Sequence, residues 1–288
     1  MSDSTPFPPA SVPARYAVIG NPIAHSKSPL IHARFARQTG EPIVYERVLA
    51  PLDGFEASVA EFVAAGGRGL NVTVPFKLDA HRLAHRLSPR AAAAGAVNTL
   101  RFDTDGIWGD NTDGIGLVRD IQQNRGMTLA RRRVLLLGAG GAARGAILPL
   151  LECRPAELCI VNRTAARALE LADAFAAAAA QYDCHFAAGT HELAAGRFDL
   201  VINATAGSLD GQLPVFDRAV LGAGTLAYDM MYGAKPTVFM DHALQLGAHV
   251  ADGLGMLVEQ AAESFWIWRG VRPQTAPVLA ELRAMLQG

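Results

Sequence analysis

A glycine-rich turn in the middle of the chain is the strongest chemical signal in this sequence. It follows an apolar run at residues 134–137, which is typical of a buried strand, and it opens a helical pattern. In that context glycines let the backbone approach a pyrophosphate, and the helix start supplies free N–H groups. Ala143 replaces the third glycine of the usual spacing, so the flanking strand and helix carry the argument against an ordinary turn. We predict dinucleotide binding by Gly138, Ala139, Gly140, Gly141 and Ala142.

The end of the next predicted strand indicates which dinucleotide binds. An enzyme that uses NAD usually places Asp or Glu there, on the ribose hydroxyls. This sequence instead has Asn162, Arg163 and Thr164, with Arg167 one turn later. There is no carboxylate to repel a 2′-phosphate, and two guanidinium groups can bind one. We therefore predict NADP as the cofactor; the alternative is that both arginines are solvated residues at a helix start.

Two serines near the N-terminus are candidate ligands for an anion. Ser26 and Ser28 lie between a predicted strand at residues 16–20 and a predicted helix at residues 29–38. Hydroxyls and backbone N–H groups at a helix start can bind an anionic group. Taken by themselves, such serines more often only cap the helix. N-capping therefore stays open as the simpler role.

A polar segment at the end of the third predicted strand offers groups for proton transfer. The alternation of a strand places Asn71 and Thr73 on one face, and Lys77 follows a proline turn that can bring it to the same place. Asn98 begins a later strand, and Asp113 begins a later helix. Alone, the lysine would be a solvated charge and the aspartate a helix cap. Together they form a candidate cleft.

Two series of alternating strands and helices must position these groups. Such alternation is typical of an α/β fold with a mainly parallel sheet. We predict an N-terminal α/β substrate domain of residues 1–113, to which the helices of residues 250–288 return, and a Rossmann-type NADP-binding domain of residues 114–249. The predicted strands are residues 16–20, 44–48, 70–74, 98–102, 107–110, 134–137, 158–161, 200–202 and 226–228; the predicted helices are residues 29–38, 52–65, 113–124, 165–180, 255–269 and 275–286, besides the helix after the glycine turn.

The order of these motifs resembles the shikimate dehydrogenase family. The resemblance extends from about residue 16 to residue 273, nearly the whole chain. So many motifs in one order make a chance match improbable. They are residues 20–29, 71–77, 95–99, 110–114, the glycine turn, 162–164, 203–205, 229–232 and 252–260.

The resemblance implies a role for each matching residue. Lys77 and Asp113 resemble the catalytic pair of the family, with Lys77 as proton donor or as an electrostatic clamp on the oxyanion. Ser26 and Ser28 would bind the substrate carboxylate, with Tyr232 nearby. The partners implied for the ring hydroxyls are Asn71, Thr73, Asn98 and Gln260, and those implied for the nicotinamide end of the cofactor are Thr205, Met230, Gly253 and Met256.

The implied activity is the NADPH-dependent, reversible reduction of 3-dehydroshikimate to shikimate in chorismate and aromatic amino acid biosynthesis. One alternative is a quinate/shikimate dehydrogenase with relaxed cofactor use, although the residues at 162–164 argue against NAD. Another is a non-catalytic NADP-binding relative, which the presence of both Lys77 and Asp113 disfavours. A third, a folate dehydrogenase, would leave Ser26 and Ser28 unexplained. Ala33, Ala206 and the residues after Tyr232 depart from the usual family pattern.

Composition sets the remaining expectations. A formal net charge of −1 provides no broad basic field for nucleic acid or for an anionic membrane. The first 13 residues resemble a disordered leader rather than a signal peptide, and no stretch approaches the ~20 apolar residues of a membrane helix. The spacing of the three cysteines fits no common zinc motif. We therefore expect a cytoplasmic protein without a metal, acting on a small molecule as a monomer or a homodimer.

Overall fold

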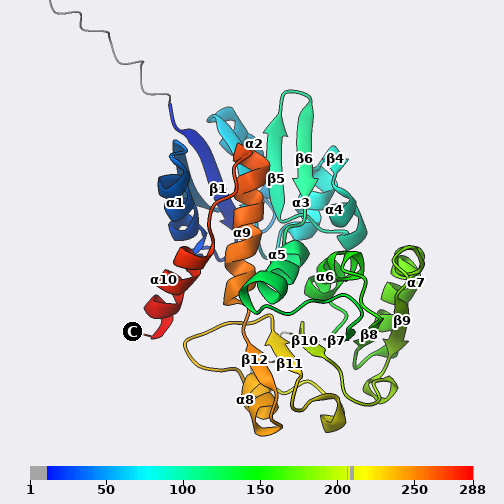
Figure 1. Cartoon of the computed structure of the whole chain (residues 1–288). Coiled ribbons are helices and arrows are strands. Elements are labelled where there is room, and N and C mark those ends of the chain that lie inside the picture. The colour runs from blue at the N-terminus through cyan, green and yellow to red at the C-terminus, as the bar shows by residue number, and fades with distance from the viewer. Residues whose placement is uncertain (1–11, 206, 208–210, 288) are drawn as a thin grey trace, which may run out of the picture.

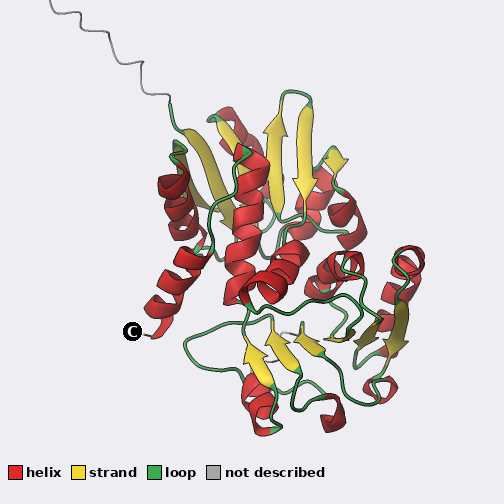
Figure 2. Cartoon of the chain, in the orientation of Figure 1, coloured by secondary structure: helices red, strands yellow, loops and turns green. Residues whose placement is uncertain are grey.

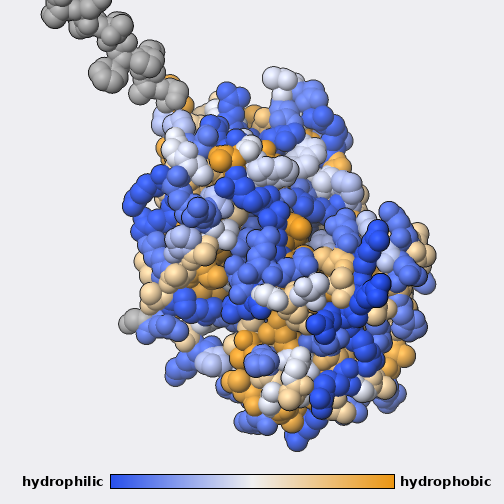
Figure 3. Space-filling view, viewed as in Figure 1, coloured by the Kyte–Doolittle hydropathy of each residue, from blue (hydrophilic) through white to orange (hydrophobic). Residues whose placement is uncertain are grey.

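The structure, a computed structural model, describes residues 12–205, 207 and 211–287. Its described residues form two sheets of six strands each, which occupy opposite ends of the molecule (Figures 1 and 2). Hydrophilic residues cover most of the face seen in Figure 1, and hydrophobic residues are interspersed among them, including a group around the second sheet (Figure 3). The predicted two-domain α/β fold is confirmed.

The first sheet combines parallel and antiparallel strands in the order β2-β1-β3-β5-β6-β4. The central strand β1 pairs in parallel with β2 and β3, whereas β5 runs antiparallel to β3 and to β6. The strands predicted at residues 98–102 and 107–110 thus correspond to the antiparallel pair β5–β6. The strands are β1 Ala14–Gly20, β2 Ile43–Leu49, β3 Gly67–Val72, β4 Arg86–Leu87, β5 Thr99–Asp103 and β6 Gly106–Asp110.

Helices bury both faces of this first sheet. On one face, Ile19, Leu70 and Leu100 pack with Phe55 and Phe62 of helix α2. The helices that follow the first strands are α1 Ser28–Thr39, α2 Phe55–Ala64, α3 Lys77–Leu83 and α4 Pro89–Ala94. On the other face, α1 packs against two C-terminal helices, α9 Leu254–Arg269 and α10 Ala276–Gln287, so the end of the chain does return to the first sheet.

The second sheet is parallel throughout, in the order β12-β11-β10-β7-β8-β9. Residues 134–137 are no more than 1% exposed, because hydrophobic clusters cover both faces of the sheet. Its elements are β7 Arg133–Leu137, α6 Gly141–Glu152, β8 Glu157–Val161, α7 Ala165–Gln181, β9 His185–Gly189, η2 His191–Leu193, β10 Leu200–Asn203, η4 Arg218–Val220, β11 Leu226–Asp229, α8 Val238–Gln245 and β12 His249–Ala251.

Helix α5, Asp113–Arg119, connects the two sheets and continues as a π-helical turn, η1 Asp120–Asn124. It packs very closely against its neighbours because it is rich in glycine. A Cβ atom on Gly114 would lie 2.2 Å from the carbonyl oxygen of Gly145 in α6, and one on Gly116 would lie 2.7 Å from the backbone nitrogen of Gln260 in α9. This packing places Asp113, the first residue of α5, at the junction of the two domains.

Several elements differ from the sequence-based prediction. The strand predicted at residues 70–74 ends at Val72, three residues before Pro75, which has no N–H to donate to a sheet. The prediction missed α3, α4, α8, β4, β9 and β12, most of which are too short to show a clear period. The first 11 residues and Ala206 lie outside the described residues. Among the described residues, none of the helices combines the length and apolarity that crossing a membrane requires.

Candidate active site

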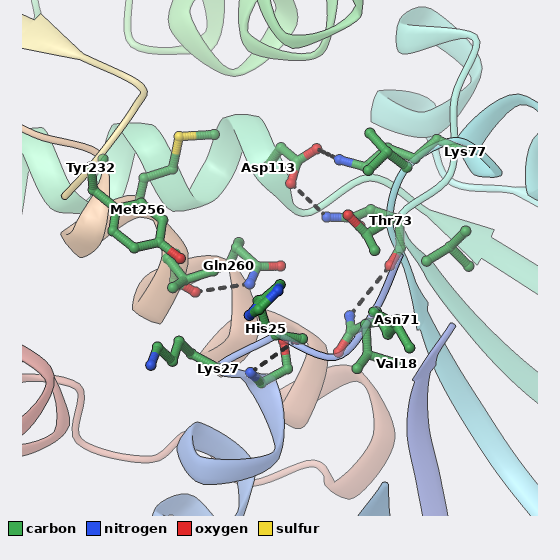
Figure 4. Close-up of a pocket in the computed structure, with 18 of the residues that line it drawn as sticks. Val18, His25, Lys27, Asn71, Thr73, Lys77, Asp113, Tyr232, Met256 and Gln260 are labelled. Carbon is green, nitrogen blue, oxygen red and sulfur yellow. Dashed lines mark hydrogen bonds and ion pairs between the residues drawn. The ribbon is translucent and has the colours of Figure 1, made fainter. Parts of the chain in front are cut away.

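A cavity of about 390 Å³ lies between the two domains. The carboxyl ends of β1 and β3 contribute to it from one side, and the start of α9 contributes from the other, so Val18 and Thr73 face Met256 and Gln260 (Figure 4). Every predicted catalytic and substrate residue lines this cavity: Ser26, Ser28, Asn71, Thr73, Lys77, Asn98, Asp113, Tyr232 and Gln260. Three residues predicted for the cofactor also line it: Met230, Gly253 and Met256.

Lys77 and Asp113 form an ion pair at one end of the cavity (Figure 4). The Lys77 Nζ lies 2.5 Å from Asp113 Oδ2, and Asn98 Nδ2 donates to the other carboxylate oxygen at 2.8 Å. The side chains of Lys77 and Asp113 are 32% and 19% exposed. The pair is therefore both held in place and accessible to a small molecule, which is the arrangement that proton transfer requires.

The amide of Asn71 is buried in the wall beside this pair. Its Nδ2 donates to Ser264 Oγ at 2.9 Å and to Thr99 Oγ1 at 3.1 Å, and its Oδ1 accepts from Tyr45 OH at 2.7 Å. Burial raises the pKa of Tyr45 well above its usual value, so this hydroxyl remains a donor. The Asn98 carbonyl, 3.3 Å from Nδ2, is a third acceptor, so both amide hydrogens go to the protein.

Asn98 is bound to the protein in the same way. Its Nδ2 donates to Thr112 Oγ1 at 3.0 Å as well as to Asp113, and its Oδ1 accepts from the Thr112 N–H at 2.8 Å and from Thr99 Oγ1 at 2.9 Å. The sequence analysis missed Tyr45, Thr99, Thr112 and Ser264. Nothing in the local sequence marks a buried hydroxyl as the partner of a site residue, although Thr99 and Thr112 adjoin predicted ones.

Ser26 and Ser28 flank Lys27, which lies across the cavity from Lys77 (Figure 4). Helix α1 begins at Ser28, and its N-cap position is Lys27, whose side chain makes no capping bond. Ser26 Oγ accepts a weak bond of 3.3 Å from the Ser28 N–H, while Arg47 holds the Ser26 carbonyl at 2.6 Å. The N-cap residue of α1 is therefore not one of the two serines, and both serines line the cavity.

Tyr232, which follows β11 of the second sheet, and Gln260, which lies on α9, complete the polar lining of the cavity. Tyr232 is 36% exposed. Gln260 Nε2 donates to the carbonyl of Leu257 at 2.8 Å, which leaves its Oε1 directed toward Thr112 at 3.4 Å. Ala33, where the sequence departs from the family pattern, is exposed on α1 and does not line the cavity.

The glycine turn lies at the carboxyl end of β7, where a Rossmann-type fold binds a pyrophosphate. Gly138 has a φ of 107°, a conformation that favours glycine, and its Cβ position is 3.0 Å from Thr205. In contrast, a Cβ atom on Gly140 or Gly141 would meet nothing within 4 Å. Both are exposed at the start of α6, which has no side-chain cap, so space and free N–H groups remain for phosphate.

Arg163 and Arg167 are exposed at the start of α7. No ion pair to either is found among the described residues, whereas most arginines of the first domain are paired. Asn162 Nδ2 donates to the Thr164 carbonyl at 2.9 Å and so shapes the turn between them. The donor set therefore suits a 2′-phosphate. We name the residues 138–142, 162–164 and Arg167 the cofactor edge.

The nicotinamide end of the predicted site joins this edge to the cavity. Thr205 Oγ1 donates to Asn203 Oδ1 at 2.7 Å, and Met230 is only 6% exposed. A Cβ atom on Gly253 would lie 2.1 Å from the Met230 carbonyl oxygen, so only glycine permits this close approach of the chain crossing. No group of three or more His, Cys, Asp or Glu that could hold a metal is found in the described part of the chain.

Three family models match successive parts of the chain. The shikimate dehydrogenase substrate binding domain matches residues 18–100, the shikimate/quinate 5-dehydrogenase model matches residues 120–227, and the shikimate 5′-dehydrogenase C-terminal domain matches residues 253–283. The chain is 61% identical over 278 residues to a shikimate dehydrogenase (NADP⁺) from Cupriavidus taiwanensis. That match covers 95% of this chain and 94% of the relative.

Solved structures share the arrangement of both domains. An Ael1 enzyme from Pseudomonas putida superposes with a TM-score of 0.88 at 49% identity, covering 93% of this chain and 98% of that one. A shikimate 5-dehydrogenase from Thermus thermophilus, solved in complex with NADP(H) and shikimate, superposes with a TM-score of 0.81 at 32% identity, covering 95% and 100%.

Proposed function

Since the chain belongs to the shikimate dehydrogenase family, we infer that it is an oxidoreductase that uses NADPH to reduce 3-dehydroshikimate reversibly to shikimate. This reaction serves the biosynthesis of chorismate and the aromatic amino acids. The observation that carries the assignment to this site is the Lys77–Asp113 pair, held by Asn98 and open to a cavity that Met230, Gly253 and Met256 also line. Because both Lys77 and Asp113 are present, the alternative that this chain only binds NADP without catalysis is disfavoured.

Lys77 is the group that handles the proton. When bound, NADPH supplies the hydride that adds to the carbonyl carbon of the substrate. The oxygen of that carbonyl then requires a proton, and Lys77 Nζ is the donor that faces the cavity. In the reverse direction, Lys77 Nζ takes the proton of the substrate hydroxyl. Asp113 holds Nζ at 2.5 Å, so the lysine is oriented before substrate arrives.

The polar lining of the cavity accounts for the remaining substrate groups. We assign the substrate carboxylate to Ser26 and Ser28, with Tyr232 nearby, because both serines line the cavity and flank Lys27, which lies across it from Lys77 (Figure 4). The ring hydroxyls then meet Thr73, Gln260, and the two amides that are fixed in the wall, Asn71 and Asn98. Because those amides are oriented by the protein, they would select hydroxyls by position.

The cofactor edge has the donors that NADP requires. The exposed start of α6, at Gly140, Gly141 and Ala142, would hold the pyrophosphate, and Arg163 with Arg167 would hold the 2′-phosphate. Asn162 and Thr164 would border the ribose. Thr205, Met230, Gly253 and Met256 would lie along the nicotinamide, since the last three also line the substrate cavity.

We further propose the boundaries of the domains, their assembly and their location. Residues 1–113 with 250–288 form the substrate domain and residues 114–249 the cofactor domain, although β12 at His249–Ala251 spans one boundary. The molecule works in the cytoplasm, where its free cysteines Cys153, Cys159 and Cys184 would stay reduced. It acts as a monomer or a homodimer, which light scattering of the purified chain distinguishes.

Initial rates of nicotinamide absorbance change test the assignment. Shikimate and quinate are each compared with NADP⁺ and with NAD⁺ as the oxidant. We expect the highest kcat/KM for shikimate with NADP⁺. Strong turnover of quinate or of NAD⁺ would move the chain to the quinate/shikimate group, and no turnover in any combination would favour a binding protein.

A further inference from the structure

We propose that Ser264 is a positioning residue that orients the substrate-binding amides of Asn71 and Asn98. Ser264 lies on α9, behind the cavity lining, and is 0% exposed. It belongs to a buried cluster that we name the hydroxyl cluster: Tyr45, Thr99, Thr112 and Ser264. The inference deepens the proposed function and rests on it, because it concerns how the same site holds its substrate.

Four groups converge on the single oxygen of Ser264. Asn71 Nδ2 donates to it at 2.9 Å, Thr99 Oγ1 lies 2.8 Å away, and Thr112 Oγ1 lies 3.3 Å away. Ser264 in turn lies 3.1 Å from the carbonyl of Gln260, one helical turn earlier. A buried serine in a helix often makes only that last bond to its own backbone. The three side-chain partners come from β3, β5 and the start of α5, so Ser264 joins four elements.

The direction of these bonds follows from the number of donors. If Ser264 donates its single hydrogen to its nearest acceptor, Thr99 Oγ1 at 2.8 Å, it accepts from Asn71 and from Thr112. Asn71 then has to turn its NH₂ toward Ser264, and its oxygen toward the Tyr45 hydroxyl. Thr99, which accepts from Asn71, gives its own hydrogen to Asn98 Oδ1. That bond turns the NH₂ of Asn98 toward Asp113.

Because the hydroxyl cluster is buried, water cannot easily replace one of its hydrogen bonds. Thr99, Thr112 and Ser264 are each 0% exposed, so bulk water does not replace the bond of 2.9 Å that the Asn71 NH₂ loses with the Ser264 hydroxyl. Asn71 would keep only the longer bonds from its NH₂ to Thr99 at 3.1 Å and to the Asn98 carbonyl at 3.3 Å, so its amide would be less firmly oriented in the cavity wall. The expected consequence is weaker substrate binding, with the cofactor edge unaffected because it shares no residue with the cluster.

Ser264→Ala tests the proposal in the full-length enzyme, with shikimate and NADP⁺ as substrates. We expect the KM for shikimate to rise about 3- to 10-fold, the scale of one lost hydrogen bond, while the KM for NADP⁺ changes less than about twofold. Thr225→Val is the matched control. Thr225 is also 0% exposed and donates its hydroxyl to one carbonyl, that of Phe198 at 2.8 Å, but in the second domain.

Tyr45→Phe separates positioning from a general loss of stability. It removes the donor to Asn71 Oδ1 from the other side of the same amide. If both hydroxyls act through Asn71, the KM effect of the double variant is smaller than the product of the two single effects. If the two single effects on KM multiply in the double variant, Ser264 and Tyr45 do not act through the same amide, and the proposal is overturned.

Other outcomes are equally decisive. A Ser264→Ala enzyme with reduced thermal stability but an unchanged KM for shikimate would make the role merely structural, like that of Thr225. If Ser264→Ala does not fold, Thr99→Val tests the same relay at its next oxygen, and a normal KM for shikimate in that variant refutes it. A wild-type enzyme that turns over no shikimate would instead refute the proposed function.

Discussion

The substrate side and the cofactor side of this molecule solve the problem of binding in opposite ways. On the substrate side, Asn71 and Asn98 are 6% and 3% exposed, and their amide hydrogens are already bonded to the protein. On the cofactor side, Arg163 and Arg167 are exposed, and Gly140 and Gly141 have open space where a Cβ atom would lie. The polar groups of the substrate side are thus already bonded to the protein before a ligand binds, whereas the donors of the cofactor side are exposed.

This difference matches the chemistry of the two ligands. Shikimate is small, and its hydroxyls are told apart from those of similar molecules only by position, so oriented groups are needed to select them. A dinucleotide phosphate carries strong negative charge, which flexible cations and free N–H groups can bind without a rigid frame. We therefore expect changes in the two regions to act on different kinetic constants.

The largest effect is expected at the reacting end of the substrate side. Lys77→Ala should lower kcat about 10²- to 10⁴-fold, since it removes a positioned proton donor. The KM for NADP⁺ should stay near normal, and Lys235→Ala, the change of an exposed lysine, is the control. A raised KM for shikimate with a normal kcat would show that Lys77 binds both ground state and transition state equally.

The cofactor side should respond through NADP⁺ alone. Replacing Arg163 or Arg167 with Ala should raise the KM for NADP⁺ about 10- to 100-fold, as expected for loss of a charged hydrogen bond, and leave the KM for shikimate unchanged. NAD⁺, which lacks the 2′-phosphate, should be used at the same low rate as before. Arg218→Ala, an exposed arginine of the same domain, is the control; equal losses with both cofactors would remove the arginines from phosphate binding.

The substrate side should also depend on pH through His32. This ring is 0% exposed and stacks on Tyr45 with centroids 4.1 Å apart. Burial lowers the pKa of His32 to about 3. Because the folded pKa is depressed, the unfolded chain takes up a proton first as pH falls below about 6.5, and stability is lost from there down.

Urea unfolding at several pH values measures this effect. Between pH 7.5 and pH 5, the group should cost the wild type about 2 kcal/mol of unfolding free energy, which His32→Phe should remove. His185→Phe, on the exposed surface of the second domain, controls for the loss of one imidazole. An identical pH dependence in His32→Phe and wild type would show that the ring is not held neutral.

The smallest effect is expected when one methyl group is added to a glycine, and it tests the difference between the open cofactor side and the closely packed domain junction. Gly141→Ala should not alter stability, because nothing lies within 4 Å of the added carbon, but it should raise the KM for NADP⁺ about fivefold by crowding a bound phosphate. The same change at Gly114, 2.2 Å from the Gly145 carbonyl oxygen, should cost about 1–3 kcal/mol of stability. An unchanged KM for NADP⁺ in Gly141→Ala would mean that phosphate does not approach this turn.

Local pattern was sufficient for the parts of the molecule that repeat a period or a motif. The buried strand at residues 134–137, the glycine turn after it and the Ala-rich helix at Ala165–Gln181 could all be predicted from residues next to one another. Short elements could not be predicted in this way. Strand β12, for example, has only three residues, and it is a strand because it pairs with β11 rather than because of its own sequence. Lys77 and Asp113 were predicted as a pair through the family resemblance, and the fold brings them together.

The sequence by itself determined the chemistry available: a lysine and an aspartate for proton transfer, hydroxyls for a carboxylate, glycines and arginines for a dinucleotide phosphate. Only the tertiary structure decided how those groups are aimed. Asn71 and Ser264 are 193 residues apart in the chain, yet their hydrogen bond turns an amide in the substrate cavity. Such a contact leaves no local signal, because its energy depends on burial and distance, which exist only once α9 has returned to pack on the first sheet.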